Sequence, residues 1–288
     1  MLQKLLAIAT RHGSSSGIPT QYPRLMIRST VAPTPPIPAL FEPKFYLLLQ
    51  GAKRMTIAGC TFDCSAETCA VASVGLPFVS EVVEASPTEP YLSVDLKLDA
   101  GIVASLLLDM REQNSTEWQS GAISLARADV GLVGPLGRLL SLLDAPSEIP
   151  VLAAQFEREL YYRLLSGPLG GRLRQIGANN SRFSQIKMAA EWIGQNANNP
   201  MSVEWLASHV GMSVTSFHRH FKAVTASSPL AYQRQLRLLE ARRQLASGEA
   251  NVTEIAYASG YVSASQFSRE YKKAFGIPPS HDAALLRR

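Results

Sequence analysis

The stretch SASQFSREYKKAFGIPPS occupies residues 263–280 and decides the fold of the C-terminal part of the chain. Its aromatic residues Phe267, Tyr271 and Phe275 are spaced four residues apart. Side chains at this spacing lie on one face of a helix, so the rings predict a buried stripe. Gly276 suits the left-handed residue that ends a helix, and the proline pair after it cannot continue one. Alone, the stretch predicts an amphipathic helix and no particular function.

A second copy of this skeleton, LASHVGMSVTSFHRHFKAVTASSP, occupies residues 206–229. The offset between the copies is 49 residues before the turn and 50 after it. The matched pairs are Ala207/Ala256, Gly211/Gly260, Phe217/Phe267, Arg219/Arg269, Phe221/Tyr271, Lys222/Lys272 and Pro229/Pro279. A small residue where two helices cross, followed four residues later by a glycine, is what a helix-turn-helix requires sterically. The repeat therefore predicts helix-turn-helix units at 203–224 and 252–276.

The segment between the copies, PLAYQRQLRLLEARRQLAS at 229–247, predicts a rigid connecting helix. With this helix and the SQFSREYKKAFGIPPS signature, the C-terminal region resembles the DNA-binding domain of the AraC family of transcription activators. FEPKFYLLLQGAKRMTIAG, VASVGLPFVSEVVEASPTEPYLSVDLKLD and FERELYYRLLSGPLGGRLRQ resemble the N-terminal domain of one AraC subgroup, a cupin-like barrel followed by helices. The resemblance implies a sensing or dimerising N-terminal half and a promoter-binding C-terminal half.

Short runs suited to β-strands, separated by turns with Gly or Pro, precede the helical part of the chain. We expect these strands at 45–49, 54–58, 69–74, 79–83 and 91–98, and helices at 100–112 and 151–165. The predicted class is α+β: an N-terminal cupin-like β-barrel with trailing helices and a C-terminal all-α tandem helix-turn-helix domain. The expected boundaries are a flexible N-terminal segment at 1–19, the sensing and dimerisation domain at 20–165, a glycine-containing linker at 166–181 and the DNA-binding domain at 182–288.

Positive charge is concentrated in the repeat region. Residues 181–288 hold 13 Lys and Arg against 7 Asp and Glu, whereas residues 1–180 hold 15 against 16. An excess of cations in one domain is what neutralisation of DNA phosphates requires. The expected partners are double-stranded promoter DNA, RNA polymerase and a small-molecule effector, with a homodimer left open.

The location expected from the sequence is the cytoplasm. No apolar run reaches the length of a membrane span, so we expect no contact with a membrane. Three cysteines without a secretion signal argue against a disulfide framework, which favours a reducing compartment.

The outward residues of the two second helices are the candidate DNA contacts. In the first copy they are Thr215, Ser216, His218, Arg219 and Lys222. In the second copy they are Ser263, Ser265, Gln266, Ser268, Arg269 and Lys272. The match to the family motif places Thr215, His218, Arg219, Ser265, Ser268 and Arg269 at base-reading positions and Lys272 at a phosphate contact. Arg219 can pair with guanine O6 and N7, and a structural or phosphate contact is the alternative for either arginine.

The second copy departs from the subgroup pattern beside its second helix. Val262 and Ala264 stand where an acidic residue and a proline are common. An acidic residue there would interact favourably with the helix dipole. We therefore expect Ser263 to cap this helix alone, and the helix to bind DNA more weakly or read a looser sequence.

The histidines give no support for an enzyme. None lies between residues 13 and 208, so the barrel lacks the cluster of a metal-dependent cupin enzyme. His218 and His220 are two residues apart on a helix and point in different directions. We therefore expect no enzyme activity, no cofactor and no metal site.

Three thiols, Cys60, Cys64 and Cys69, lie close together in the sequence. On a strand, Cys60 and Cys64 share one face, which we expect to point inward. We favour their being small buried hydrophobic residues. A sensor of oxidants or electrophiles is the alternative, and it requires an activating cation such as a nearby lysine or arginine. A signal-independent architectural DNA-binding protein is a further alternative for the whole chain.

Overall fold

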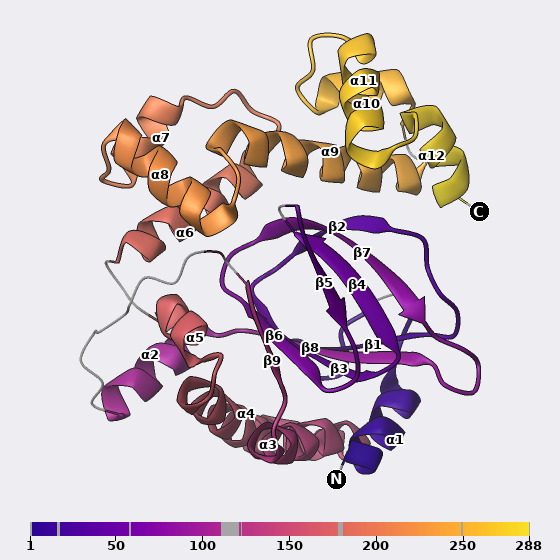
Figure 1. Ribbon diagram of the computed structural model, residues 1–288, viewed down its shortest axis with the longest axis vertical. Helices are drawn as coiled ribbons and strands as arrows, with labels where there is room; N and C mark the ends of the chain where they lie inside the picture. The colour runs from indigo at the N-terminus through magenta and orange to yellow at the C-terminus, as the bar shows by residue number, and fades with distance from the viewer. Residues whose placement is uncertain are drawn as a thin grey trace. The chain divides into compact units, whose positions relative to one another are not determined.

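A computed structural model of the chain describes residues 2–15, 18–57, 59–110, 121, 123–177, 181–248 and 250–287 (Figure 1). The chain divides into two compact units. The first unit comprises most residues up to Ser184, and the second begins at Gln185. The observed boundary thus falls three residues beyond the end of the predicted linker.

Two antiparallel sheets form the first unit (Figure 1). The strands are β1 (Leu25–Thr30), β2 (Ile37–Phe41), β3 (Lys44–Gln50), β4 (Ala52–Ile57), β5 (Cys60–Cys64), β6 (Thr68–Ala72), β7 (Leu76–Glu84), β8 (Tyr91–Lys97) and β9 (Ile123–Arg127). The five-stranded sheet has the order β1-β8-β3-β6-β9, and the four-stranded sheet has the order β2-β7-β4-β5. All the recorded strand pairs are antiparallel. The predicted β-domain followed by helices is confirmed.

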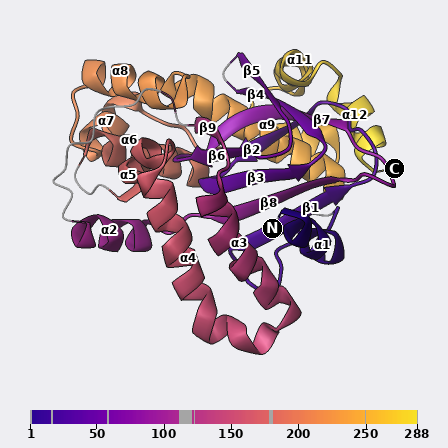
Figure 2. The same ribbon diagram turned by 60° about the horizontal axis from the view of Figure 1, so that its bottom comes forward.

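Helices cover the outer face of the five-stranded sheet and lie beside it (Figure 2). They are α1 (Leu2–His12), α2 (Ala100–Asp109), α3 (Val130–Ser141), α4 (Ile149–Ser166) and α5 (Gly170–Gly177). Successive side chains of a strand point to opposite faces, so alternate residues of β3 contact the helices. Phe45, Leu47 and Leu49 belong to the main core on this side, while Tyr46 faces the other sheet.

The predicted flexible segment at 1–19 is wrong for residues 2–12, which form helix α1. Leu5, Ile8 and Ala9 are almost completely buried and belong to the main core. Their spacing places them on one helical face, and burial of that face stabilises the helix against the sheet.

The predicted linker at 166–181 is also wrong, because α5 occupies its centre. Its glycines permit close packing. A Cβ atom at Gly170 would lie 2.1 Å from the carbonyl oxygen of Leu165, and one at Gly177 would lie 2.7 Å from a methyl carbon of Val103 in α2. The glycines therefore serve helix packing, whereas the prediction attributed them to a hinge.

The second unit is helical among its described residues. Its helices are α6 (Arg182–Gln195), α7 (Val203–His209), α8 (Val214–Thr225), α9 (Pro229–Ser247), α10 (Val252–Ala258), α11 (Ala264–Phe275) and α12 (Pro279–Leu286). The predicted helix-turn-helix units correspond to α7–α8 and α10–α11, and the predicted connecting helix corresponds to α9. Within the described ranges, every helix is too short or too polar to cross a bilayer.

Candidate nucleic-acid interface

The two helix-turn-helix units share the same helix crossing. Ala207 in α7 and Ala256 in α10 are completely buried where the second helix of each unit crosses the first. The chain leaves each first helix with the same hydrogen bond: the Met212 amide donates to the Ala207 carbonyl at 2.8 Å, and the Tyr261 amide donates to the Ala256 carbonyl at 3.1 Å. The predicted small residue at the crossing is confirmed in both copies.

The glycine in each turn has a backbone conformation that other residues rarely adopt. Gly211 has φ +71° and Gly260 has φ +77°. The left-handed region is accessible to glycine without the Cβ clash that other residues suffer. These two residues therefore set the angle at which α8 and α11 leave their turns.

Serine side chains cap both second helices. The Ser213 hydroxyl accepts a hydrogen bond from the Ser216 amide at 3.4 Å, and the Ser263 hydroxyl accepts one from the Gln266 amide at 3.2 Å. Each bond satisfies a backbone donor that a helix N-terminus leaves free. The predicted cap at Ser263 is confirmed, and Val262 beside it is 87% exposed.

The buried stripes of α8 and α11 are equivalent. Phe217 and Phe221 are completely buried with ring centroids 5.4 Å apart, and Phe267 and Tyr271 are completely buried with the same separation. Gly276 ends α11 in the left-handed conformation, as predicted. With the stripe fixed inward, the opposite face of each helix points outward; in α8, His220, Val224 and Thr225 are buried together with the stripe.

The candidate DNA contacts lie on these outward faces. Those that are exposed are Thr215, His218, Arg219, Lys222, Ser263, Ser265, Arg269 and Lys272. Those that are partly buried are Ser216, Gln266 and Ser268. The side chains offer hydroxyl, imidazole, amide, guanidinium and ammonium groups, which suit base edges and phosphates.

One partly buried contact, Gln266, is held by its own helix. Its side-chain amide donates to Glu270 at 3.3 Å. The carboxylate of Glu270 also accepts from the Tyr261 hydroxyl at 3.1 Å and lies 3.5 Å from Arg234 of α9. Glu270 was not among the predicted site residues; it holds the Gln266 amide by this hydrogen bond.

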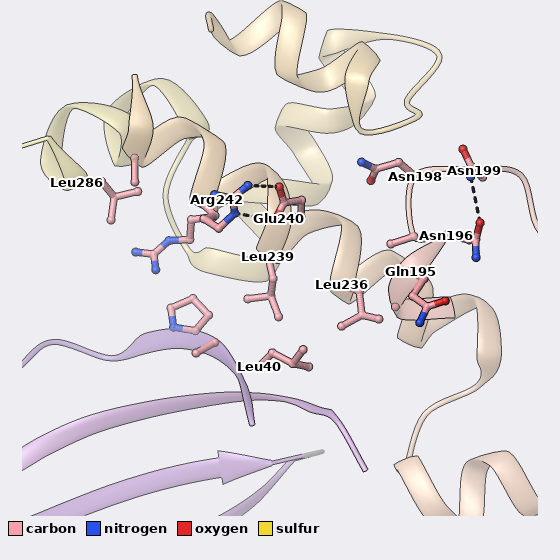
Figure 3. A pocket seen from close by; sticks show the side chains of 16 residues that line it. Leu40, Gln195, Asn196, Asn198, Asn199, Leu236, Leu239, Glu240, Arg242 and Leu286 are labelled. Atoms are coloured by element: carbon pink, nitrogen blue, oxygen red, sulfur yellow. Dashed lines mark hydrogen bonds and ion pairs between the residues drawn. The ribbon is translucent and has the colours of Figure 1, made fainter. Parts of the chain in front are cut away.

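The loop between α6 and α7 joins the parts of the second unit. Figure 3 shows this loop, with Asn196 and Asn199, beside α9. The Gln233 amide of α9 donates to the Asn199 carbonyl at 2.8 Å, and Arg237 donates to the Ala197 carbonyl at 3.0 Å. Because α9 also contacts both recognition helices, these bonds hold the two helix-turn-helix units in one orientation.

A buried ion pair fixes the other end of α9. Arg242 donates to Asp282 of α12 at 2.7 Å, and the Tyr271 hydroxyl of α11 donates to the same carboxylate at 2.6 Å. Asp282 is only 2% exposed. The carboxylate therefore connects the second recognition helix to α9 and α12, a role that sequence reasoning missed.

Replacement of Arg219 and of Lys272 by alanine should have different effects on DNA binding. Arg219→Ala should relax base preference at one or two positions and cost about 1–3 kcal/mol, because a bidentate guanidinium discriminates between bases. Lys272→Ala should weaken binding to all sequences alike and lower the salt slope by about one, because a phosphate contact releases counterions. Titrations of matched and mismatched duplexes at several salt concentrations measure both effects. Identical specificity profiles for the two variants would contradict this division of roles.

The three thiols lie in different surroundings. Cys60 is exposed, so the expectation that it points into the core is wrong; it lies at the start of the edge strand β5. Cys64 and Cys69 are buried, and burial raises the pKa of each thiol to about 11. Lys53 pairs with Cys64 across β4 and β5, and its charge lowers the pKa of Cys64 less than burial raises it. Among the described residues, no three His, Cys, Asp or Glu side chains are grouped as a metal site would require.

We expect the cysteines to be dispensable for DNA binding. A variant with Cys60→Ser, Cys64→Ser and Cys69→Ser should bind the same duplex as the wild type in reducing buffer. Its first unit should be less stable, because serine places a hydroxyl where Cys64 and Cys69 are buried. Gel-shift titration and urea denaturation test the two statements. A reporter response to an oxidant that disappears only with Cys64 or Cys69 would instead support the thiol-sensor alternative.

Comparisons with known proteins agree with this architecture. The family described as AraC-type transcriptional regulator N-terminus matches residues 21–172, and a helix-turn-helix domain family matches residues 206–284. The HTH-type transcriptional activator RhaS of Pectobacterium atrosepticum is 28% identical over 163 residues, which cover 57% of this chain and 56% of RhaS. The HTH-type transcriptional regulator GbdR of Pseudomonas aeruginosa is 29% identical over 152 residues, which cover 52% of this chain and 41% of GbdR. The chain thus spans about half the length of these relatives.

Solved structures show the same fold over nearly the whole chain. A structure of ToxT from Vibrio cholerae has a TM-score of 0.57 at 11% identity, covering 91% of this chain and 99% of ToxT. A ToxT structure with bound unsaturated fatty acid has a TM-score of 0.54 at 13% identity, covering 89% of this chain and 94% of ToxT. At such low identity the likeness concerns the fold alone. The N-terminal family covers more than half of the chain, and the chain therefore belongs to the AraC family of transcriptional regulators.

Proposed function

We propose that this protein is a sequence-specific transcription regulator, an activator, that binds double-stranded promoter DNA through α8 and α11. The observation that carries the proposal is the duplicated helix-turn-helix. Both recognition helices have a serine cap, a buried aromatic pair and an outward face of polar and basic residues. A helix of this kind enters the major groove with its N-terminal residues at the base edges.

The N-terminal unit responds, in this proposal, to a small molecule or a stress signal. Membership of the AraC family, with its activator relatives, supports a regulatory role, and one fold relative holds a fatty acid. The partners are promoter DNA, RNA polymerase, a small-molecule effector and a second copy of the chain. The site of action is the cytoplasm.

Selection from a random duplex library with the full chain tests the proposed DNA reading. Because two helices read the duplex, the enriched sequences should contain two short elements separated by a fixed spacing. The Arg219→Ala, Arg269→Ala double variant is the matched control, since both side chains are exposed and their loss leaves the cores intact. This variant should bind DNA without the enriched preference. If the wild type enriches no sequence, the protein is an architectural DNA-binding protein and the proposal fails.

A further inference from the structure

The recognition helix α8 of the first helix-turn-helix contains a polar contact between two successive residues. Nη2 of Arg219 lies 3.3 Å from Nε2 of His220, within hydrogen-bond distance. Arg219 is exposed on the outward face of the helix, whereas His220 is only 8% exposed. The contact therefore joins a candidate base-reading side chain to a side chain that is buried in the domain.

The chemistry of the two groups fixes the direction of this hydrogen bond. A guanidinium carries only donors, so Nε2 of His220 is the acceptor. An imidazole nitrogen accepts only when it carries no proton, which requires the neutral ring with its proton on Nδ1. The contact uses one of the five N–H groups of Arg219, and two parallel donors remain for O6 and N7 of a guanine.

Packing of α8 holds the imidazole of His220 in place. The neighbouring residue Phe221 is completely buried, and its ring meets the ring of Tyr232 in α9 edge-on with centroids 5.5 Å apart. A buried side chain keeps little rotamer freedom, whereas an exposed arginine loses rotamer freedom when it binds a base. A contact that orders Arg219 before DNA arrives therefore lowers the entropy cost of reading that base.

The second helix-turn-helix lacks the equivalent contact among its described residues. Glu270 stands 50 residues after His220, at the same position of the repeat. Its carboxylate accepts hydrogen bonds from Tyr261 and Gln266. The equivalent arginine, Arg269, is exposed and forms no hydrogen bond or ion pair in the part of the chain that the structure describes. The two recognition arginines therefore differ in how their side chains are held.

We propose that His220 is a positioning residue, which holds the guanidinium of Arg219 for the reading of a guanine in the major groove. This inference rests on the proposed DNA-reading function and adds to it a buried residue that acts only through Arg219. The hydrogen bond restricts the directions in which the remaining donors of Arg219 point. Arg219 therefore discriminates between base pairs through a side chain that is ordered before binding, which Arg269 is not.

Two substitutions separate the hydrogen bond of His220 from its packing. His220→Leu fills the buried space without an acceptor, and His220→Gln places an amide oxygen close to the position of Nε2. The measured quantity is the ratio of the affinities of the full chain for a selected duplex and for the same duplex changed at the base pair whose preference Arg219→Ala removes. His220→Leu should lower this ratio on the order of 3- to 10-fold, because one hydrogen bond is lost, and His220→Gln should keep it within about 2-fold.

Two internal controls distinguish positioning from a general loss of structure. In a chain that already carries Arg219→Ala, His220→Leu should have no further effect on the ratio, because both changes remove the same interaction. Discrimination at the base pair that Arg269 reads should keep its wild-type value in both His220 variants. Urea denaturation shows whether each variant is folded.

Nitrogen NMR of the imidazole rings provides a readout that needs no DNA. In the wild type, Nε2 of His220 should carry no proton, because it accepts from Arg219. Arg219→Ala removes the donor and should shift the ring toward the tautomer with a proton on Nε2. A protonated Nε2 in the wild type would contradict the proposal.

The outcomes separate this proposal from the proposed function. If His220→Leu weakens both duplexes equally, or lowers the ratio as much in the Arg219→Ala background, His220 serves packing alone and the proposal is wrong. Selective DNA binding by the wild type would then leave the regulatory function standing. A wild-type chain that selects no sequence would contradict the regulatory function itself, so the wild type tests the function and the His220 variants test the proposal.

Discussion

Gly260→Ala should destabilise the second helix-turn-helix by about 3–4 kcal/mol and remove its contribution to DNA binding. Two effects add at this position. Gly260 has φ +77°, which an alanine adopts only with strain. In addition, a Cβ atom there would lie 2.6 Å from the backbone carbonyl oxygen of Asn198, in the loop before α7. The turn would have to move away from the loop that connects it to the first helix-turn-helix.

The equivalent glycine of the first copy is a matched control. Gly211 has nearly the same φ, but the nearest atom to its Cβ position is a side-chain nitrogen of Gln185 at 3.4 Å. A Cβ at Gly276 would contact no atom within 4 Å among the described residues. Alanine at Gly211 or Gly276 should therefore cost only the conformational strain, about 1–2 kcal/mol. Urea denaturation gives the free energy of unfolding of all three variants. Equal losses of this free energy in Gly260→Ala and Gly211→Ala would show that the contact with Asn198 is unimportant.

Glu157→Ala should cost the N-terminal unit about 1–3 kcal/mol, because it removes a buried carboxylate that accepts from two tyrosine hydroxyls and is one of the two carboxylate partners of Arg24, the other being Asp99. Glu157 in α4 is completely buried, and Arg24 forms an ion pair with it. The same carboxylate accepts from the Tyr22 hydroxyl at 2.5 Å and from the Tyr161 hydroxyl at 2.9 Å. These contacts connect the segment before β1 to α4, so the loss should appear as a lower urea midpoint of the first unit.

Glu159, two residues further along α4, provides the comparison. Its side chain is 38% exposed and forms an ion pair with Arg138. An ion pair in contact with water contributes only about 0.2–1 kcal/mol, so Glu159→Ala should leave the urea midpoint nearly unchanged. A similar effect of the two alanine variants would mean that the buried network contributes no more than a surface ion pair.

The sequence predicted the central strands of the β-domain and none of its edge strands. The predicted strands correspond to β3, β4, β6, β7 and β8. Each of these has a hydrogen-bonded neighbouring strand on both sides. The missed strands β1, β2, β5 and β9 are the outermost strands of the two sheets. Edge strands bury fewer side chains, so their apolar pattern is weak: β5 has one buried residue and β9 has none. In β2, Pro38 is tolerated because an edge residue need not donate to a neighbour.

The helix-turn-helix units were predicted closely because two copies constrain one another. The predicted starts of the two units, at residues 203 and 252, agree with the structure, and Gly276 ends α11 as predicted. The grouping of Lys53 with the rings of Tyr46, Phe78 and Tyr91 was missed because these residues come from separate strands. One local signal existed: Lys53 alternates with Met55 and Ile57, which are buried, so the strand period places its side chain on the inward face. The pairing of Lys53 with its aromatic neighbours depends on the packing of the two sheets, which the sequence pattern does not specify.

The central claim is that α8 and α11 read one face of a duplex as a rigid pair. The loop that contacts Gly260 and α9 fixes their separation, so the two DNA elements must lie in successive major-groove segments about one helical turn, roughly 10 bp, apart. Insertion of about 5 bp between the elements of a selected site turns one of them to the opposite face of the duplex. We predict that the full chain then binds no more tightly than to a site with one element scrambled. Unchanged affinity after the insertion would contradict the rigid tandem arrangement.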